Sequence, residues 1–168
     1  MEEHRQGDRA VLFWFFCSLL WFPLFASFGF ILAVKFFQPT FLTDQSWLTF
    51  GRMRPAHVNG VLFGFLSSGL IAGMLYVMPR LCRTPLKSPT LAKAAAIMWN
   101  GAILAGIFLI LGGYSQGREY AELPWVIDVA VMVTLALLGF IVFGPLGHRG
   151  ERKLDVRDGA YRATLLWV

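Results

Sequence analysis

Four long apolar runs constrain the fold of this chain more than any other feature. The chain has 168 residues, 57% of them hydrophobic, and the runs cover about residues 10–34, 58–78, 94–111 and 124–146. A helix needs about 20 predominantly apolar residues to cross the hydrocarbon core of a bilayer. The runs also lack the alternation of polar and apolar residues that strands of membrane barrels show. The sequence therefore predicts an all-α integral membrane protein with four transmembrane helices, forming one membrane domain over residues 1–168.

The two ends of the chain refine this prediction. The first run is longer than the apolar core of a signal peptide, and its leader mixes acids with bases, so we expect a genuine span. Its many aromatic side chains are expected to face lipid. A charged tail over residues 147–168 ends in the apolar stretch 161–168, which predicts the opening of a fifth helix.

The net charge of +5 is explained by topology rather than by nucleic acid. If the N-terminus is cytoplasmic, 11 of the 15 Lys and Arg residues fall on the inner side of the membrane. Such a bias follows the positive-inside rule. The outer side then holds only Lys35, Arg52, Arg54 and Arg118. We therefore expect the lipid bilayer as a partner and no nucleic acid.

The second run is preceded by the segment 51–60, which places a histidine, His57, near two arginines, Arg52 and Arg54. Pro55 is well suited to a first helical turn and predicts that the helix begins close to it. An ionisable residue at the end of a membrane helix is costly, which marks it as a candidate functional residue. Neutral imidazole is a common haem ligand, and arginine pairs with carboxylates such as haem propionates. We interpret His57 as an axial haem ligand.

Small residues follow His57 at helical spacing. Gly60, Gly64 and Ser68 share a face with it, and this pattern has two interpretations. The glycines permit close packing of a neighbouring helix, or they leave room for a flat macrocycle. In the third run, Asn100 is expected to hydrogen-bond to a neighbouring helix.

A second outer segment brings further charges to the His57 side. Arg118, Glu119 and Glu122 precede the fourth run. Haem propionates would explain Arg52, Arg54 and Arg118 on a side where basic residues are scarce. The acidic pair could hold calcium, which favours carboxylate oxygens. The alternative is a set of exposed salt bridges, each worth about 0–1 kcal/mol.

A second axial ligand is not available within the chain. The other histidines, His4 and His148, are expected on the inner side, about 30 Å from His57. A haem at His57 would therefore take its second ligand from outside this chain. The sequence contains no histidine cluster suited to copper, no phosphate-binding loop and no zinc spacing.

Two motifs together resemble a known family. The segments 50–59 (FGRMRPAHVN) and 118–125 (REYAELPW) are similar to catalytic subunit I of cbb3-type haem–copper cytochrome c oxidases. The related nitric oxide reductases share a similar pattern. The resemblance covers about residues 37–125 and extends more loosely to the end.

The resemblance implies roles for individual residues. His57 would be an axial ligand of low-spin haem b, Arg54 would pair with a propionate, and Arg118 would lie near the propionates. Glu119 would contribute to a calcium site, with Glu122 as the second candidate. Members of the family have about twelve spans, so this chain would match about the first third. The copper ligands and the high-spin haem ligand would belong to later spans of the complete subunit.

Three functions follow as alternatives. The first is the N-terminal part of a respiratory terminal oxidase in the cell (inner or plasma) membrane. It would pass electrons from cytochrome c to an oxygen-reducing haem–copper centre, coupled to proton translocation. Its partners would be the remainder of subunit I, c-type cytochrome subunits and soluble cytochrome c. The second is a piece of a nitric oxide reductase large subunit, and the step from Tyr120 to Ala121 favours the oxidase over it. The third is a non-catalytic membrane scaffold or assembly protein, whose haem content would not depend on His57.

Overall fold

A computed structural model describes residues 2–118 and 121–147, with the side chains of 2–4 and 144–147 left undescribed. Within these ranges every regular element is helical. The elements in chain order are α1 (Glu2–Phe37), η1 (Ser46–Leu48), α2 (Phe50–Asn59), η2 (Gly60–Ser67), α3 (Ser68–Cys82), α4 (Pro89–Gly112) and α5 (Trp125–Gly147).

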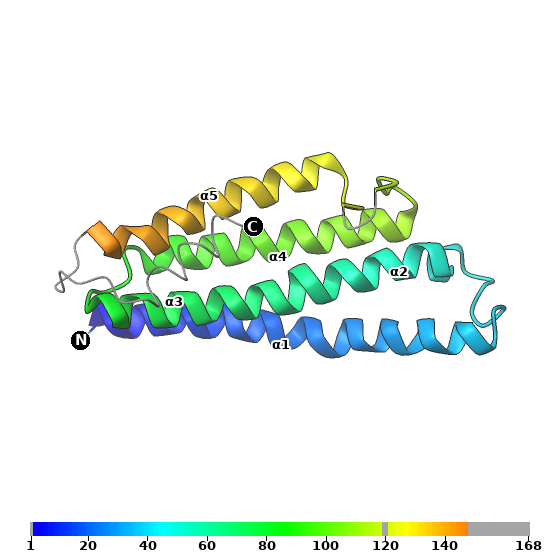
Figure 1. Ribbon diagram of the computed structural model, residues 1–168, viewed down its shortest axis with the longest axis horizontal. Helices are drawn as coiled ribbons and strands as arrows, with labels where there is room; N and C mark the ends of the chain where they lie inside the picture. Colours follow the sequence, from blue (N-terminus) through cyan, green and yellow to red (C-terminus); the bar gives the residue numbers. More distant parts are fainter. Residues whose placement is uncertain (1, 119–120, 148–168) are drawn as a thin grey trace.

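The chain crosses the length of the bundle four times. α2, η2 and α3 follow one another without a break, so that they form one long helix with α1, α4 and α5 beside it (Figure 1). All four helices are long and apolar enough to cross a membrane. The predicted all-α membrane fold is confirmed. The predicted opening of a fifth helix lies outside the described residues.

The second long helix begins earlier than the sequence predicted. It starts at Phe50, so Pro55 lies inside the helix and not in its first turn. The prediction followed the preference of proline for the first turn of a helix, where its missing N–H costs nothing. Packing overrides this preference, because Met53, Pro55 and Ala56 are all buried. His57 therefore stands in the second turn of a helix, and Arg52 and Arg54 are helical rather than part of a loop.

The aromatic residues of α1 divide between two surfaces. Phe13, Phe15, Phe16, Phe22 and Phe30 are exposed, as expected for lipid-facing side chains. The same expectation is wrong for Trp14, Trp21 and Phe25, which are buried in the core.

The buried tryptophans form hydrogen bonds that join α1 to α4 and α4 to η2. Trp14 Nε1 donates to the Ala92 carbonyl at 2.9 Å, and Trp99 Nε1 donates to the Phe63 carbonyl at 2.9 Å. Trp21 Nε1 donates to Asn100 Oδ1 at 2.7 Å, which confirms the predicted bond from Asn100 to another helix.

The element η2 is a π-helical stretch in the middle of the second long helix. Side chains from neighbouring helices donate to its carbonyls: Trp99 to Phe63, and Ser18 Oγ to Phe65 at 2.8 Å. Stretches of π-helix occur frequently at functional sites. This one begins three residues after His57.

Candidate functional site

His57 projects from α2 against α1. Its Nδ1 lies 2.6 Å from the Phe25 carbonyl oxygen. A carbonyl only accepts hydrogen bonds, so Nδ1 carries a proton, and in the neutral form of the ring Nε2 keeps its lone pair. Among the described residues, none forms a hydrogen bond with Nε2. In metal-ligating histidines the other ring N–H is commonly held by a carbonyl or carboxylate, which sets the tautomer and the ring orientation.

A glycine in α1 makes this position of the imidazole possible. A Cβ atom at Gly29 would lie 2.7 Å from His57 Cε1 and 3.2 Å from Nε2. Any side chain at residue 29 would therefore push the ring away from α1. His57 remains half-buried in this position.

The glycine face that follows His57 is filled by protein. A Cβ at Gly64 would lie 2.5 Å from the Trp21 ring, and one at Gly60 would collide with the ring of Phe25. The close-packing interpretation is therefore confirmed. The alternative, that this face leaves room for a macrocycle, is wrong, because aromatic side chains of α1 occupy the space.

Arg52 has a partner that the sequence did not predict. Its Nη1 donates to the Leu111 carbonyl at 3.1 Å, and a Cβ at Gly113 would lie 2.9 Å from its Nη2. Gly113 ends α4 with a left-handed φ of 96°, which favours glycine. The guanidinium thus caps the C-terminus of α4, where a cation is favoured by the helix dipole.

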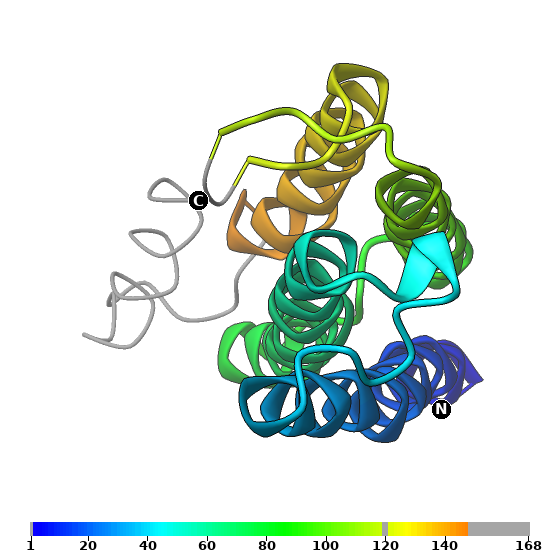
Figure 2. The same cartoon turned by 90° about the vertical axis from the view of Figure 1, so that its right-hand side faces the viewer.

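Arg54, Arg118 and Glu122 line one pocket of about 440 Å³. The other lining residues come from the first turns of α2 and from the segment between α4 and α5: Phe50, Gly51, Pro55, Ser115, Gln116 and Gly117. Figure 2 faces the end of the bundle where these two regions meet. The pocket thus places two cations and one carboxylate at the end of the bundle that also carries His57.

Glu122 ties the segment between α4 and α5 to α2. Its Oε2 accepts from Asn59 Nδ2 at 3.1 Å, and the same amide nitrogen donates to the Pro55 carbonyl at 2.8 Å. Both side chains are buried, Asn59 to 1% exposure and Glu122 to 8%. The bond fixes the turn of α2 that carries His57. Sequence reasoning missed Asn59, although a polar residue two positions after His57 and inside an apolar run was a signal.

Further bonds hold the same segment together. The Gln116 backbone N–H donates to the Glu122 carbonyl at 3.0 Å, and Gln116 Nε2 donates to Asp128 Oδ2 at 3.2 Å. Asp128 stands in the first turn of α5, where a carboxylate is favoured by the helix dipole. Glu119 and the side chains of His4 and His148 lie outside the described residues. Across residues 2–118 and 121–147, no three His, Cys, Asp or Glu residues gather as a metal site. Calcium at Glu119 and Glu122 remains a prediction.

Comparison with known proteins identifies the family. The family described as "Cytochrome C and Quinol oxidase polypeptide I" matches residues 9–161. The chain is 30% identical to the cbb3-type cytochrome c oxidase subunit CcoN1 of Stutzerimonas stutzeri, over 90% of this chain and 32% of that protein. It is 30% identical to cytochrome c oxidase subunit 1 of Rhodobacter capsulatus, over 98% of this chain and 30% of that protein. A subunit 1 homologue of Azorhizobium caulinodans is 29% identical over 100% of this chain and 29% of its own length.

The chain thus spans about a third of the length of the curated relatives it matches. The family match covers most of the chain, including both motifs, the first long helix from residue 9 onward and the other three in full. The chain belongs to the cytochrome c and quinol oxidase polypeptide I family, and the named relatives support the cbb3-type resemblance.

Proposed function

We propose that the chain binds low-spin haem b through His57 Nε2. The observation that carries the proposal is the bond between His57 Nδ1 and the Phe25 carbonyl, which leaves Nε2 as the free donor atom. The iron would receive its second axial ligand from outside this chain. Haem would supply a one-electron carrier at this position, and the chain would hold and orient it.

The pocket beside the start of α2 supports the same proposal. Arg54 and Arg118 line it and would pair with the haem propionates, since guanidinium groups bind carboxylates strongly. Glu119 and Glu122 would hold calcium near these groups. Arg52 donates from Nη1 to the Leu111 carbonyl, and its remaining N–H groups would be the ones to reach a propionate.

The chain would act as part of a respiratory terminal oxidase in the cell (inner or plasma) membrane, with its N-terminus in the cytoplasm. Electrons from cytochrome c would pass through the haem at His57 to an oxygen-reducing haem–copper centre, coupled to proton translocation. The remainder of subunit I and c-type cytochrome subunits would be its partners. The named relatives are oxidase subunits, which favours this function over nitric oxide reduction.

A reduced-minus-oxidised visible spectrum tests the proposal. The sample is the chain in the assembly in which it leaves its native membrane in mild detergent. We expect a low-spin b-type band that stays with the chain through purification. A folded preparation without any haem band would contradict the proposal and favour a scaffold or assembly protein.

A further inference from the structure

A groove of about 300 Å³ runs along the seam between α1 and α4, and it shares no lining residue with the pocket of Arg54, Arg118 and Glu122. It is lined by Cys17, Leu20, Trp21, Leu24, Asn100, Gly101 and Leu104. The side-chain amide of Asn100 is already engaged, because Oδ1 accepts from Trp21 and Nδ2 donates to the Ala96 carbonyl at 2.8 Å. The groove therefore offers an almost wholly apolar surface in the middle of two helices that are long enough to span the membrane.

Both helices carry a basic residue on the N-terminal side of this groove, Arg9 on α1 and Lys93 on α4. Arg9 and Leu20 are eleven residues apart on α1, and Lys93 and Leu104 are eleven residues apart on α4. Eleven residues make three helical turns, so that each pair shares a face and is separated by about 16 Å along the axis. This is about half the thickness of the hydrocarbon core. The cations thus lie at the depth of lipid headgroups when the groove lies near the middle of the bilayer.

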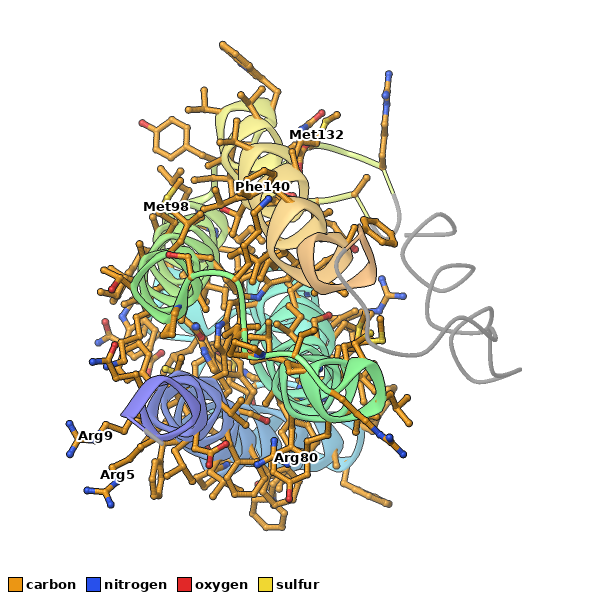
Figure 3. All side chains as sticks on the ribbon, turned by 90° about the vertical axis from the view of Figure 1, so that its left-hand side faces the viewer. Arg5, Arg9, Arg80, Met98, Met132 and Phe140 are labelled. Atoms are coloured by element: carbon orange, nitrogen blue, oxygen red, sulfur yellow. The ribbon has the colours of Figure 1, made fainter. Side chains whose placement is uncertain are left out.

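The side-chain view agrees with this placement. Figure 3 shows Arg5 and Arg9 projecting outward from α1 on the side of the bundle where Met98 of α4 also lies. Both arginines are exposed, and they stand one helical turn apart.

These cations differ from the other basic residues at the same end of the bundle. Arg80 pairs with Asp8 at 2.8 Å and stacks on Tyr76, and Lys87 lies over the Phe140 ring. In the part of the chain that the structure describes, no ion pair or hydrogen bond engages the side chains of Arg5, Arg9 or Lys93. Their charges are therefore available to an external anion.

We propose that the seam between α1 and α4 binds an anionic phospholipid, with its headgroup at Arg5, Arg9 and Lys93 and one acyl chain in the groove. The positive side chains complement the negative headgroup, and the apolar lining of the groove suits an acyl chain. The expected cytoplasmic position of this end agrees with the leaflet in which anionic lipids attract basic segments. The proposal does not depend on haem binding, so each can fail without the other.

Lipid binding to the full chain in detergent, measured by native mass spectrometry, tests the headgroup site. The probes are dioleoyl phosphatidylglycerol and dioleoyl phosphatidylcholine, which share their acyl chains. We expect the anionic lipid to bind more tightly, and Arg9→Gln to weaken its binding about fivefold. Lys87→Gln removes one positive charge at the same end and serves as the matched control, with binding unchanged. Equal binding of the two lipids, or an equal loss in both variants, would overturn the proposal.

A second pair of variants tests the groove. A Cβ at Gly101 or at Gly73 meets no atom within 4 Å, so leucine fits the backbone at either position. Gly101→Leu fills the groove and should weaken phosphatidylglycerol binding at least tenfold, whereas Gly73→Leu on α3 should not. Displacement of the lipid by equimolar glycerol 3-phosphate, or unchanged binding in Gly101→Leu, would mean that no acyl chain occupies the groove.

Discussion

The middle of the bundle and its His57 end differ in how their side chains pack. In the middle, Trp21 and Phe25 of α1 fill the space over Gly64 and Gly60, and the tryptophan N–H groups donate to α4 and η2. At the His57 end, a pocket of about 440 Å³ remains between charged side chains. On the glycine face of the middle, aromatic rings fill the space between α1 and η2, whereas a pocket lined by charged side chains remains at the His57 end. The close packing contacts and the proposed ligand site thus lie on the same long helix, only a few residues apart.

Gly29 and Phe25 join the two regions. Phe25 packs its ring on Gly60 and offers its carbonyl to His57, while Gly29 leaves space for the imidazole. The packing of the middle therefore also sets the orientation of the proposed ligand. Changes in the middle should alter the free energy of unfolding, and changes at the His57 end should alter the proposed haem site as well.

The largest expected effect on stability comes from filling the glycine face. Gly64→Leu forces a side chain into the Trp21 ring, 2.5 Å from where its Cβ would stand, and should cost about 3 kcal/mol. Gly73→Leu is the control, because its Cβ would meet open space. The free energies of unfolding in mixed micelles give the comparison. Equal stability of the two variants would show that the Trp21 ring does not fill the glycine face.

A smaller loss of stability is expected from breaking the hydrogen bond between Asn59 of α2 and Glu122 of the segment between α4 and α5. Asn59→Ala leaves the buried carboxylate of Glu122 without its donor and should cost about 2 kcal/mol. Glu122→Gln keeps an oxygen that can accept from Asn59, so it should cost less. The same unfolding measurement checks both variants. A larger loss in Glu122→Gln than in Asn59→Ala would contradict the role given to this bond.

The smallest loss of stability is expected from removing the single hydrogen bond between Trp21 and Asn100. Trp21→Phe keeps the ring against Gly64 but removes the donor to Asn100, and should cost about 0.6 kcal/mol, the average for such bonds in membranes. Trp47→Phe, at a half-exposed tryptophan outside the long helices, is the control and should change nothing. A loss above about 2 kcal/mol would contradict the small contribution that we assign to this bond.

The sequence predicted the four long helices because membrane-spanning length and apolar composition leave few alternatives. It also predicted the bond of Asn100 to a neighbouring helix. It could not decide what covers Gly60 and Gly64, since the covering rings come from α1, more than 30 residues earlier. For the same reason it could not predict that Arg52 caps α4 or that Glu122 reaches Asn59. Each of these contacts depends on how helices pack, which local patterns do not specify.

The haem b content of a His57→Ala variant tests the central proposal most directly. The variant and the unaltered chain are purified in the same assembly, and reduced-minus-oxidised spectra are recorded at equal protein concentration. The proposal predicts that the low-spin b-type band disappears, because no other described residue replaces the lost axial ligand, while the assembly stays folded. A normal bis-histidine spectrum in the variant would contradict it and assign the haem to other residues.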